Sequence, residues 1–181
     1  MTDPDWHADL ERYPPRPFLR EQSVWAVAVY RFGRRNDRRP AGLGKKLGDR
    51  FYWLAYRFIE TLTGISIPKS VEVGPGLRIY HFGNIFVHSA TKIGARCTLR
   101  QGVTIGNRRE GGPAPLIEDD VEFGAYAQVL GGIRIGRGAK IGAMSVVLTD
   151  VPAGATAVGV PARIVLPVES KSEFRVAEKV P

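Results

Sequence analysis

A repeat of six residues runs through the chain from Ile67 onward and limits the folds open to it. Aliphatic side chains return at positions 67, 73, 79 and 85, then at 87, 93, 99 and 105, and again in steps of six from 117 to 147, where Phe123 is the one aromatic member. Six is neither the 3.6-residue period of an α-helix nor the two-residue alternation of a long strand. It fits short strands joined by tight turns and stacked around a narrow aliphatic core. The sequence therefore predicts a mainly β protein with a parallel β-helix of hexapeptide repeats over residues 66–166.

Residues 1–65 carry a helical pattern instead. In the first predicted helix the apolar residues recur every four positions, at Val24, Ala28 and Phe32. We expect Gly33 to end this helix and the basic run 31–40 to form a solvated turn. A second helix is predicted from a cap at Asp49 to a stop at Gly64, and its apolar face holds Trp53, Leu54, Phe58 and Leu62. We expect that face to pack against the β-helix or a neighbouring subunit, with contact to a membrane surface as the alternative.

Composition narrows the function classes. The net charge of +8 is spread evenly, with four excess cations in residues 1–65 and four in 66–181. This distribution favours an anionic small ligand over a nucleic acid, which usually meets a concentrated basic patch. The single cysteine, Cys97, falls at an inward position of the repeat and can form no intrachain disulfide. We expect a cytoplasmic protein whose residues 167–181 form a polar tail.

Four stretches resemble the left-handed β-helix acyltransferases, in the version found in serine acetyltransferases. They are "GPGLRIYHFGNIFV", "IGARCTLRQGVTIGN", "NRREGGPAPLI" and "IGRGAKIGAMSVVLTDVPAGATAVGVPARIV". The resemblance covers about residues 64–166 and implies a left-handed prism that assembles as a homotrimer with active sites between subunits. It also implies acetyl-CoA as co-substrate, with no metal.

The repeat shifts by two residues between Ile79 and Val87, at a histidine. His81 matches the family's catalytic histidine, which the resemblance makes the general base of acetyl transfer. Histidine suits that task because imidazole titrates close to neutral pH. We expect the shift to project this side chain out of the wall. Further candidates for support or acceptor binding near it are Ser66, Tyr80, Asn84 and His88.

Acetyl-CoA is expected to contact the later coils. Candidate binding residues at glycine-rich turns are Gly106, Asn107, Arg108, Gly124, Ala125, Gly142 and Ala143. Arg163 is the candidate partner of a phosphate, because guanidinium pairs well with phosphate oxygens.

The chain also departs from the family pattern. Ser66 and Tyr80 stand where serine acetyltransferases carry aspartates, and Ala114 stands where they carry a second histidine. These changes favour an acceptor without an ammonium group, such as a saccharide hydroxyl, over free serine. Serine O-acetylation remains the alternative. A non-catalytic scaffold and a zinc-dependent β-helix carbonic anhydrase are weaker alternatives, the latter because only His81 and His88 lie in the repeat.

Overall fold

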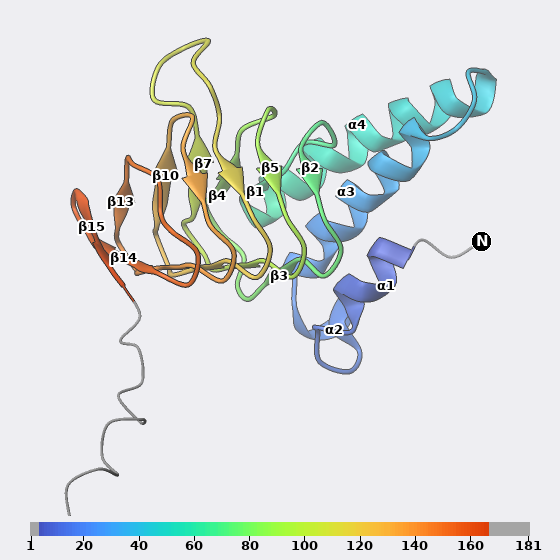
Figure 1. Cartoon of the computed structure of the whole chain (residues 1–181). Coiled ribbons are helices and arrows are strands. Elements are labelled where there is room, and N and C mark those ends of the chain that lie inside the picture. The colour runs from blue at the N-terminus through green and yellow to red at the C-terminus, as the bar shows by residue number, and fades with distance from the viewer. Residues whose placement is uncertain (1–3, 167–181) are drawn as a thin grey trace, which may run out of the picture.

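The computed structural model describes residues 4–166 and divides them into a helical end and a stack of coils (Figure 1). The helices within this range are α1 (Pro4–Leu10), α2 (Pro17–Arg20), α3 (Ser23–Asp37) and α4 (Leu43–Thr63). α3 and α4 lie side by side and extend beyond the first coil, and the β14–β15 hairpin closes the opposite end. The predicted tail at 167–181 lies outside the described residues.

Three sheets form the faces of the prism, and each of the first four coils gives one strand to each. Sheet A holds β1 (Ile65–Ser66), β4 (Ile85–Val87), β7 (Thr104–Gly106), β10 (Gln128–Leu130) and β13 (Val146–Val147). Sheet B holds β2 (Glu72–Val73), β5 (Lys92–Ile93), β8 (Leu116–Ile117) and β11 (Arg134–Ile135). Sheet C holds β3 (Arg78–Ile79), β6 (Thr98–Leu99), β9 (Glu122–Phe123), β12 (Lys140–Ile141), β14 (Thr156–Gly159) and β15 (Ala162–Val165). All pairs are parallel except β14–β15, so the predicted β-helix is confirmed.

Strand register locates the irregularities of the repeat. Val129 pairs with Val147 after 18 residues, which is one coil of three six-residue sides. Ile79 pairs with Leu99 after 20 residues, and Ile105 pairs with Val129 after 24. The two extra residues lie in the corner between β3 and β4, and the six extra residues lie between β7 and β8. Both insertions are confined to corners, so the aliphatic column inside the prism is continuous.

Side chains from the helical end satisfy backbone groups of the first coil. The Tyr30 hydroxyl donates to Val71 O at 2.8 Å and accepts from the Val73 N–H at 3.2 Å. Ser23 Oγ donates to Ile79 O at 2.8 Å, and the Tyr13 hydroxyl accepts from the Ile79 N–H at 3.2 Å. These bonds replace the strand that would otherwise pair there.

A buried ion pair completes this attachment. The Arg31 guanidinium donates to Asp9 Oδ2 at 2.7 Å and to Gly74 O at 2.6 Å, and Asp9 Oδ1 accepts the Leu77 N–H at 2.7 Å. The Asp9 side chain is fully buried and that of Arg31 is 4 % exposed. One pair therefore joins α1, α3 and the first coil.

Three details of the helix prediction are wrong. α3 continues past Gly33 to Asp37, so most of the segment 31–40 is helical rather than a turn. Gly33 marks close helix packing, since a Cβ there would lie 2.6 Å from the Tyr52 ring. α4 starts at Leu43, six residues before Asp49, while its stop at Gly64 is confirmed by a left-handed cap with φ 65°.

Of the two partners predicted for the apolar face of α4, the β-helix of the same chain does not cover it, and packing against a neighbouring subunit stays a prediction. The members of this face remain exposed, Leu54 most of all at 73 %. α4 instead turns Gly48 and Tyr52 inward, and both are buried.

Replacing Arg31 with Met should destabilise the fold by about 3–5 kcal/mol, because it leaves the Asp9 carboxylate buried without its counter-ion. Urea denaturation followed by circular dichroism measures the loss. The control is Arg96→Met, which removes a half-exposed partner of Asp120 and should change stability little. Equal stability of the two variants would contradict this account.

Cys97 should be inert toward alkylation in the folded protein. The prediction of an inward position is confirmed, and burial raises the pKa of the thiol to about 11. At pH 8 the thiol is therefore protonated as well as inaccessible. Iodoacetamide labelling measured by mass spectrometry should reach Cys97 only after denaturation in urea. Rapid labelling of the native chain would show that the coil opens.

Candidate active site

His81 lies in the corner inserted between β3 and β4. Tyr80, His81 and Phe82 are exposed, so this corner projects its side chains away from the core. Gly83 and Asn84 have positive φ angles of 107° and 54°, which let the two extra residues turn sharply. Gly83 O accepts the Gly102 N–H at 2.9 Å, which ties the corner to the next coil. The shift of the repeat thus lies where the sequence analysis placed a projecting side chain.

The helical end also fixes the residue before His81. Arg78 donates to Glu21 through both terminal nitrogens, at 2.5 and 2.8 Å. Its guanidinium lies 4.0 Å from the Tyr13 ring centroid and 4.4 Å from that of Tyr80. This clamp orients Tyr80 directly beside His81. The sequence analysis missed Glu21, because 57 residues separate it from Arg78.

A hollow of about 270 Å³ opens beside His81. It lies between the connector from α2 to α3 and the inserted corner, and its walls are Arg20, Glu21, Gln22, Ser23, Tyr80, His81 and Phe82. The hollow gives a small molecule access to the imidazole from the side of the helices.

Four of the predicted cofactor residues lie on the same edge of the prism as His81. We call this the His81 edge, formed by the corners 80–84, 100–103, 124–127 and 142–145. The Tyr126 N–H donates to Gln101 O and the Met144 N–H donates to Ala125 O, both at 2.9 Å. Gly124 packs directly on the next corner, since a Cβ there would lie 2.4 Å from Ala143 N. With about 4.8 Å between coils, the edge runs about 14 Å from His81 to Gly142 and Ala143.

The remaining candidates lie elsewhere. His88, Gly106, Asn107 and Arg108 occupy the opposite edge of sheet A, which we call the loop edge because residues 107–115 project from it (Figure 1). His88 is half-buried, and its Nδ1 accepts the Ala90 N–H at 3.2 Å, as a turn residue would. Arg163 is exposed on β15 at the far end of the prism. A single copy therefore does not bring His81 and His88 together.

Ser66 faces the helices rather than His81. Its Oγ lies 2.9 Å from the Tyr56 hydroxyl, which also donates to Glu60 Oε1 at 3.3 Å. Burial raises the pKa of Tyr56, so this hydroxyl is protonated at neutral pH. Within residues 4–166 no hydrogen bond joins Ser66 to His81.

Gln101 is a further residue of the His81 edge that the sequence analysis missed. Its Oε1 is buried and, within the described residues, has no hydrogen-bond partner. An unpaired buried acceptor is costly, but this oxygen is enclosed within the corner and is not open to a bound molecule. Its only sequence signal is a polar residue before Gly102, which is common at turns.

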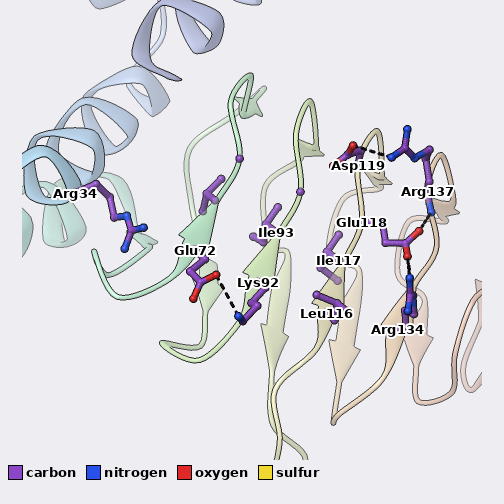
Figure 2. Close-up of a pocket in the computed structure, with 13 residues that line it drawn as sticks. Arg34, Glu72, Lys92, Ile93, Leu116, Ile117, Glu118, Asp119, Arg134 and Arg137 are labelled. Carbon is purple, nitrogen blue, oxygen red and sulfur yellow. Dashed lines mark hydrogen bonds and ion pairs between the residues drawn. The ribbon is translucent and has the colours of Figure 1, made fainter. Parts of the chain in front are cut away.

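A hollow larger than the one beside His81 lies on sheet B and contains none of the predicted site residues (Figure 2). Its volume is about 540 Å³. Lys92 pairs with Glu72 at 3.2 Å, Arg137 pairs with Asp119 at 3.2 Å, and Arg134 pairs with Glu118. Arg134 and Arg137 lower the pKa of Glu118. The charges on this face are matched across successive coils, which indicates a stabilising ladder rather than a reaction centre.

Comparisons with known proteins agree with this architecture. The family model of the bacterial transferase hexapeptide (six repeats) matches residues 114–149. Serine acetyltransferase of Bacillus licheniformis is 44% identical over 106 residues, which is 58% of this chain and 49% of that protein. Serine acetyltransferase of Helicobacter pylori is 39% identical over 121 residues, which is 64% of this chain and 71% of that protein. The chain thus spans about half the length of the first of these relatives.

A solved structure extends the likeness to the helical end. Serine acetyltransferase in complex with CoA superposes with a TM-score of 0.73 and 32% identity, over 89% of this chain and 66% of that one. Since the relative from Helicobacter is covered over more than two thirds of its length, the chain belongs to the serine acetyltransferase family of hexapeptide-repeat transferases.

Proposed function

We propose that this chain is an acetyl-CoA-dependent O-acetyltransferase with serine as its acceptor and His81 as general base. The observation that carries the proposal is the position of His81, exposed at the start of an edge whose later corners hold Gly124, Ala125, Gly142 and Ala143. An extended thioester arm along this edge can present its acetyl group near the imidazole. The relatives named above support serine better than the saccharide that we expected first.

The proposed reaction needs one general base and backbone N–H donors. The His81 imidazole takes the proton of the acceptor hydroxyl as its oxygen attacks the thioester carbonyl. Backbone N–H groups near the site stabilise the tetrahedral oxyanion. The carbon–sulfur bond then breaks, and the imidazolium returns the proton to the departing thiolate. The products are an O-acetyl ester and free CoA.

We further propose a homotrimer in which the His81 edge of one copy faces the loop edge of its neighbour. The two edges border sheet A on opposite sides, so a threefold arrangement can bring them together between subunits. Gly106, Asn107 and Arg108 of one copy would then act with His81 of the next. The helical region 1–65 would attach to the acyltransferase region 66–166 without supplying the base.

The His81→Ala variant should lose about 10²–10⁴-fold in kcat for CoA release from acetyl-CoA and serine, because the general base is gone. Release is followed with a thiol reagent at fixed pH. The matched control is His7→Ala, an exposed histidine on α1, which should keep wild-type activity. Activity of His81→Ala equal to that of His7→Ala would exclude His81 as the base.

A saccharide hydroxyl is the second candidate acceptor, because of the surroundings of His81. Ser66 and Tyr80 replace the expected aspartates, so neither of these positions supplies a carboxylate that would suit an ammonium group. Tyr80 and Phe82 in the corner and Phe86 on the adjoining strand β4 are 43, 50 and 51% exposed, and aromatic faces of this kind pack against sugar rings.

This candidate predicts a different pattern in the same assay. A panel of sugars and nucleotide sugars should yield CoA release where serine does not, and Phe86→Ala should raise KM for the sugar but not for acetyl-CoA. Efficient turnover of serine would exclude the saccharide reading. Absence of turnover with every acceptor would instead support a scaffold without catalysis.

A further inference from the structure

The outer face of α4 carries a stripe of large apolar side chains that nothing described covers. Its members recur at intervals of three or four residues along the whole helix: Leu43, Leu47, Phe51, Leu54, Phe58 and Leu62. Their exposed fractions run from 53 to 75%. The helix has 21 residues, so this α4 stripe is about 30 Å long. Single exposed apolar residues are ordinary, but a continuous stripe of this size marks an interaction surface.

Cations border the α4 stripe on one flank. Lys46, Arg50, Trp53 and Arg57 recur along that flank at intervals of three or four residues, and the three cations are exposed. Within residues 4–166 neither Lys46 nor Arg50 has a carboxylate partner. Arg57 pairs with Glu60 at 3.1 Å. The flank therefore carries a net positive charge.

The carboxylates of α4 are engaged by other groups. Asp49 accepts Lys69 Nζ at 2.7 Å, and this bond lowers the pKa of Asp49. Glu60 accepts the Tyr56 hydroxyl as well as Arg57. No described acidic side chain is left free to offset the cations beside the stripe.

The other border, toward α3, is also cationic. Phe51 meets Phe32 edge to face with ring centroids 5.3 Å apart, and the Arg35 guanidinium lies 5.9 Å from the Phe32 centroid. Figure 1 shows α3 and α4 extending together past the first coil, so this surface stands clear of the prism. No helix among the described residues is long and apolar enough to cross a membrane.

From these observations we propose that α4 docks in the plane of an anionic phospholipid surface. An apolar stripe with Lys and Arg at its borders and a tryptophan beside it is the pattern of a helix that lies at a bilayer interface. The apolar side chains enter the acyl boundary, while Lys46, Arg50 and Arg35 meet lipid phosphates.

Charge also weighs against a second copy of the chain as the partner. An antiparallel twofold contact between α4 helices would place each flank against the same flank of its mate. In an antiparallel pair centred on Trp53, Arg50 would lie opposite Arg57 of the mate and Lys46 opposite Glu60. Glu60 is the one carboxylate on the described part of that flank, so the two flanks together would still bring more cations than carboxylates into the contact. An anionic lipid surface supplies the missing negative charge.

Vesicle flotation of the full chain tests the proposal without any activity readout. The protein should float with vesicles of phosphatidylglycerol and phosphatidylcholine, and stay in solution with phosphatidylcholine alone. Lys46→Glu/Arg50→Glu should weaken binding at least about tenfold, and 0.5 M NaCl should weaken it as well. Binding to both vesicle types with no effect of salt would overturn the claim that the cations beside the stripe recognise anionic lipid.

The contribution of the apolar side chains to vesicle binding is tested with a matched pair of variants. Leu54→Gln/Phe58→Gln removes two exposed members of the stripe and should abolish flotation. The control, Val165→Gln/Leu166→Gln, changes two apolar residues that are 53 and 64% exposed at the opposite end of the prism, and should bind like wild type. Equal loss in both variants, or none in the first, would overturn the proposal.

Sedimentation equilibrium without vesicles tests whether a second copy of the chain covers the α4 stripe instead. The assembly mass of wild type and of Leu54→Gln/Phe58→Gln should be equal. A mass for the wild type twice that of the variant would show that a second copy covers the stripe, and would overturn lipid docking.

Discussion

The hydrogen bonds between successive coils are the constraint on which the rest of this structure depends. Each strand contributes only two to four residues, so no strand is stable except as a rung of the parallel stack. The stack fixes the distance between coils and requires an aliphatic side chain at each inward position. Variation is left to the corners, and both insertions are found there. The position of the candidate site follows from this stacking. An edge of stacked corners is where backbone groups and projecting side chains can together meet a long ligand.

The helical end depends on the same constraint. The first coil would otherwise present unpaired N–H and C=O groups, and side chains of Tyr13, Ser23, Tyr30 and Arg31 occupy them. The helices therefore replace a strand rather than lie loosely beside one. This also explains why α3 carries more buried polar residues than α4, with Ser23, Arg31 and Asn36 on α3 and Thr63 on α4. α4 packs on α3 and is left with a free face.

The sequence was most informative where the periodicity is strict. The core residues of the coils, the corner that carries His81 and the projecting loop follow from the spacing of Val and Ile. The common edge of His81 with Gly124 and Gly142 follows from counting corners. The helix boundaries were harder to predict. Gly33 was expected to end α3, but the helix continues through it and the missing side chain lets the Tyr52 ring pack closely there. Contacts between distant segments, such as Glu21 with Arg78 or Ser66 with Tyr56, have no periodic signature. The acceptor is the least predictable feature, since it depends on a few exposed side chains that the fold does not dictate.

The two ends of the prism bear on whether such a chain could polymerise. A parallel stack offers an open rung at each end, and two such rungs from different molecules could join without limit. Here one end is occupied by hydroxyl and guanidinium groups, and the last rung turns back on itself as the antiparallel strand β15. Within residues 4–166, side chains therefore fill the open groups of β2 and β3 at one end, and at the other end β15 reverses the strand direction of sheet C, so on these faces a further parallel coil finds no matching rung and growth into a fibre is disfavoured.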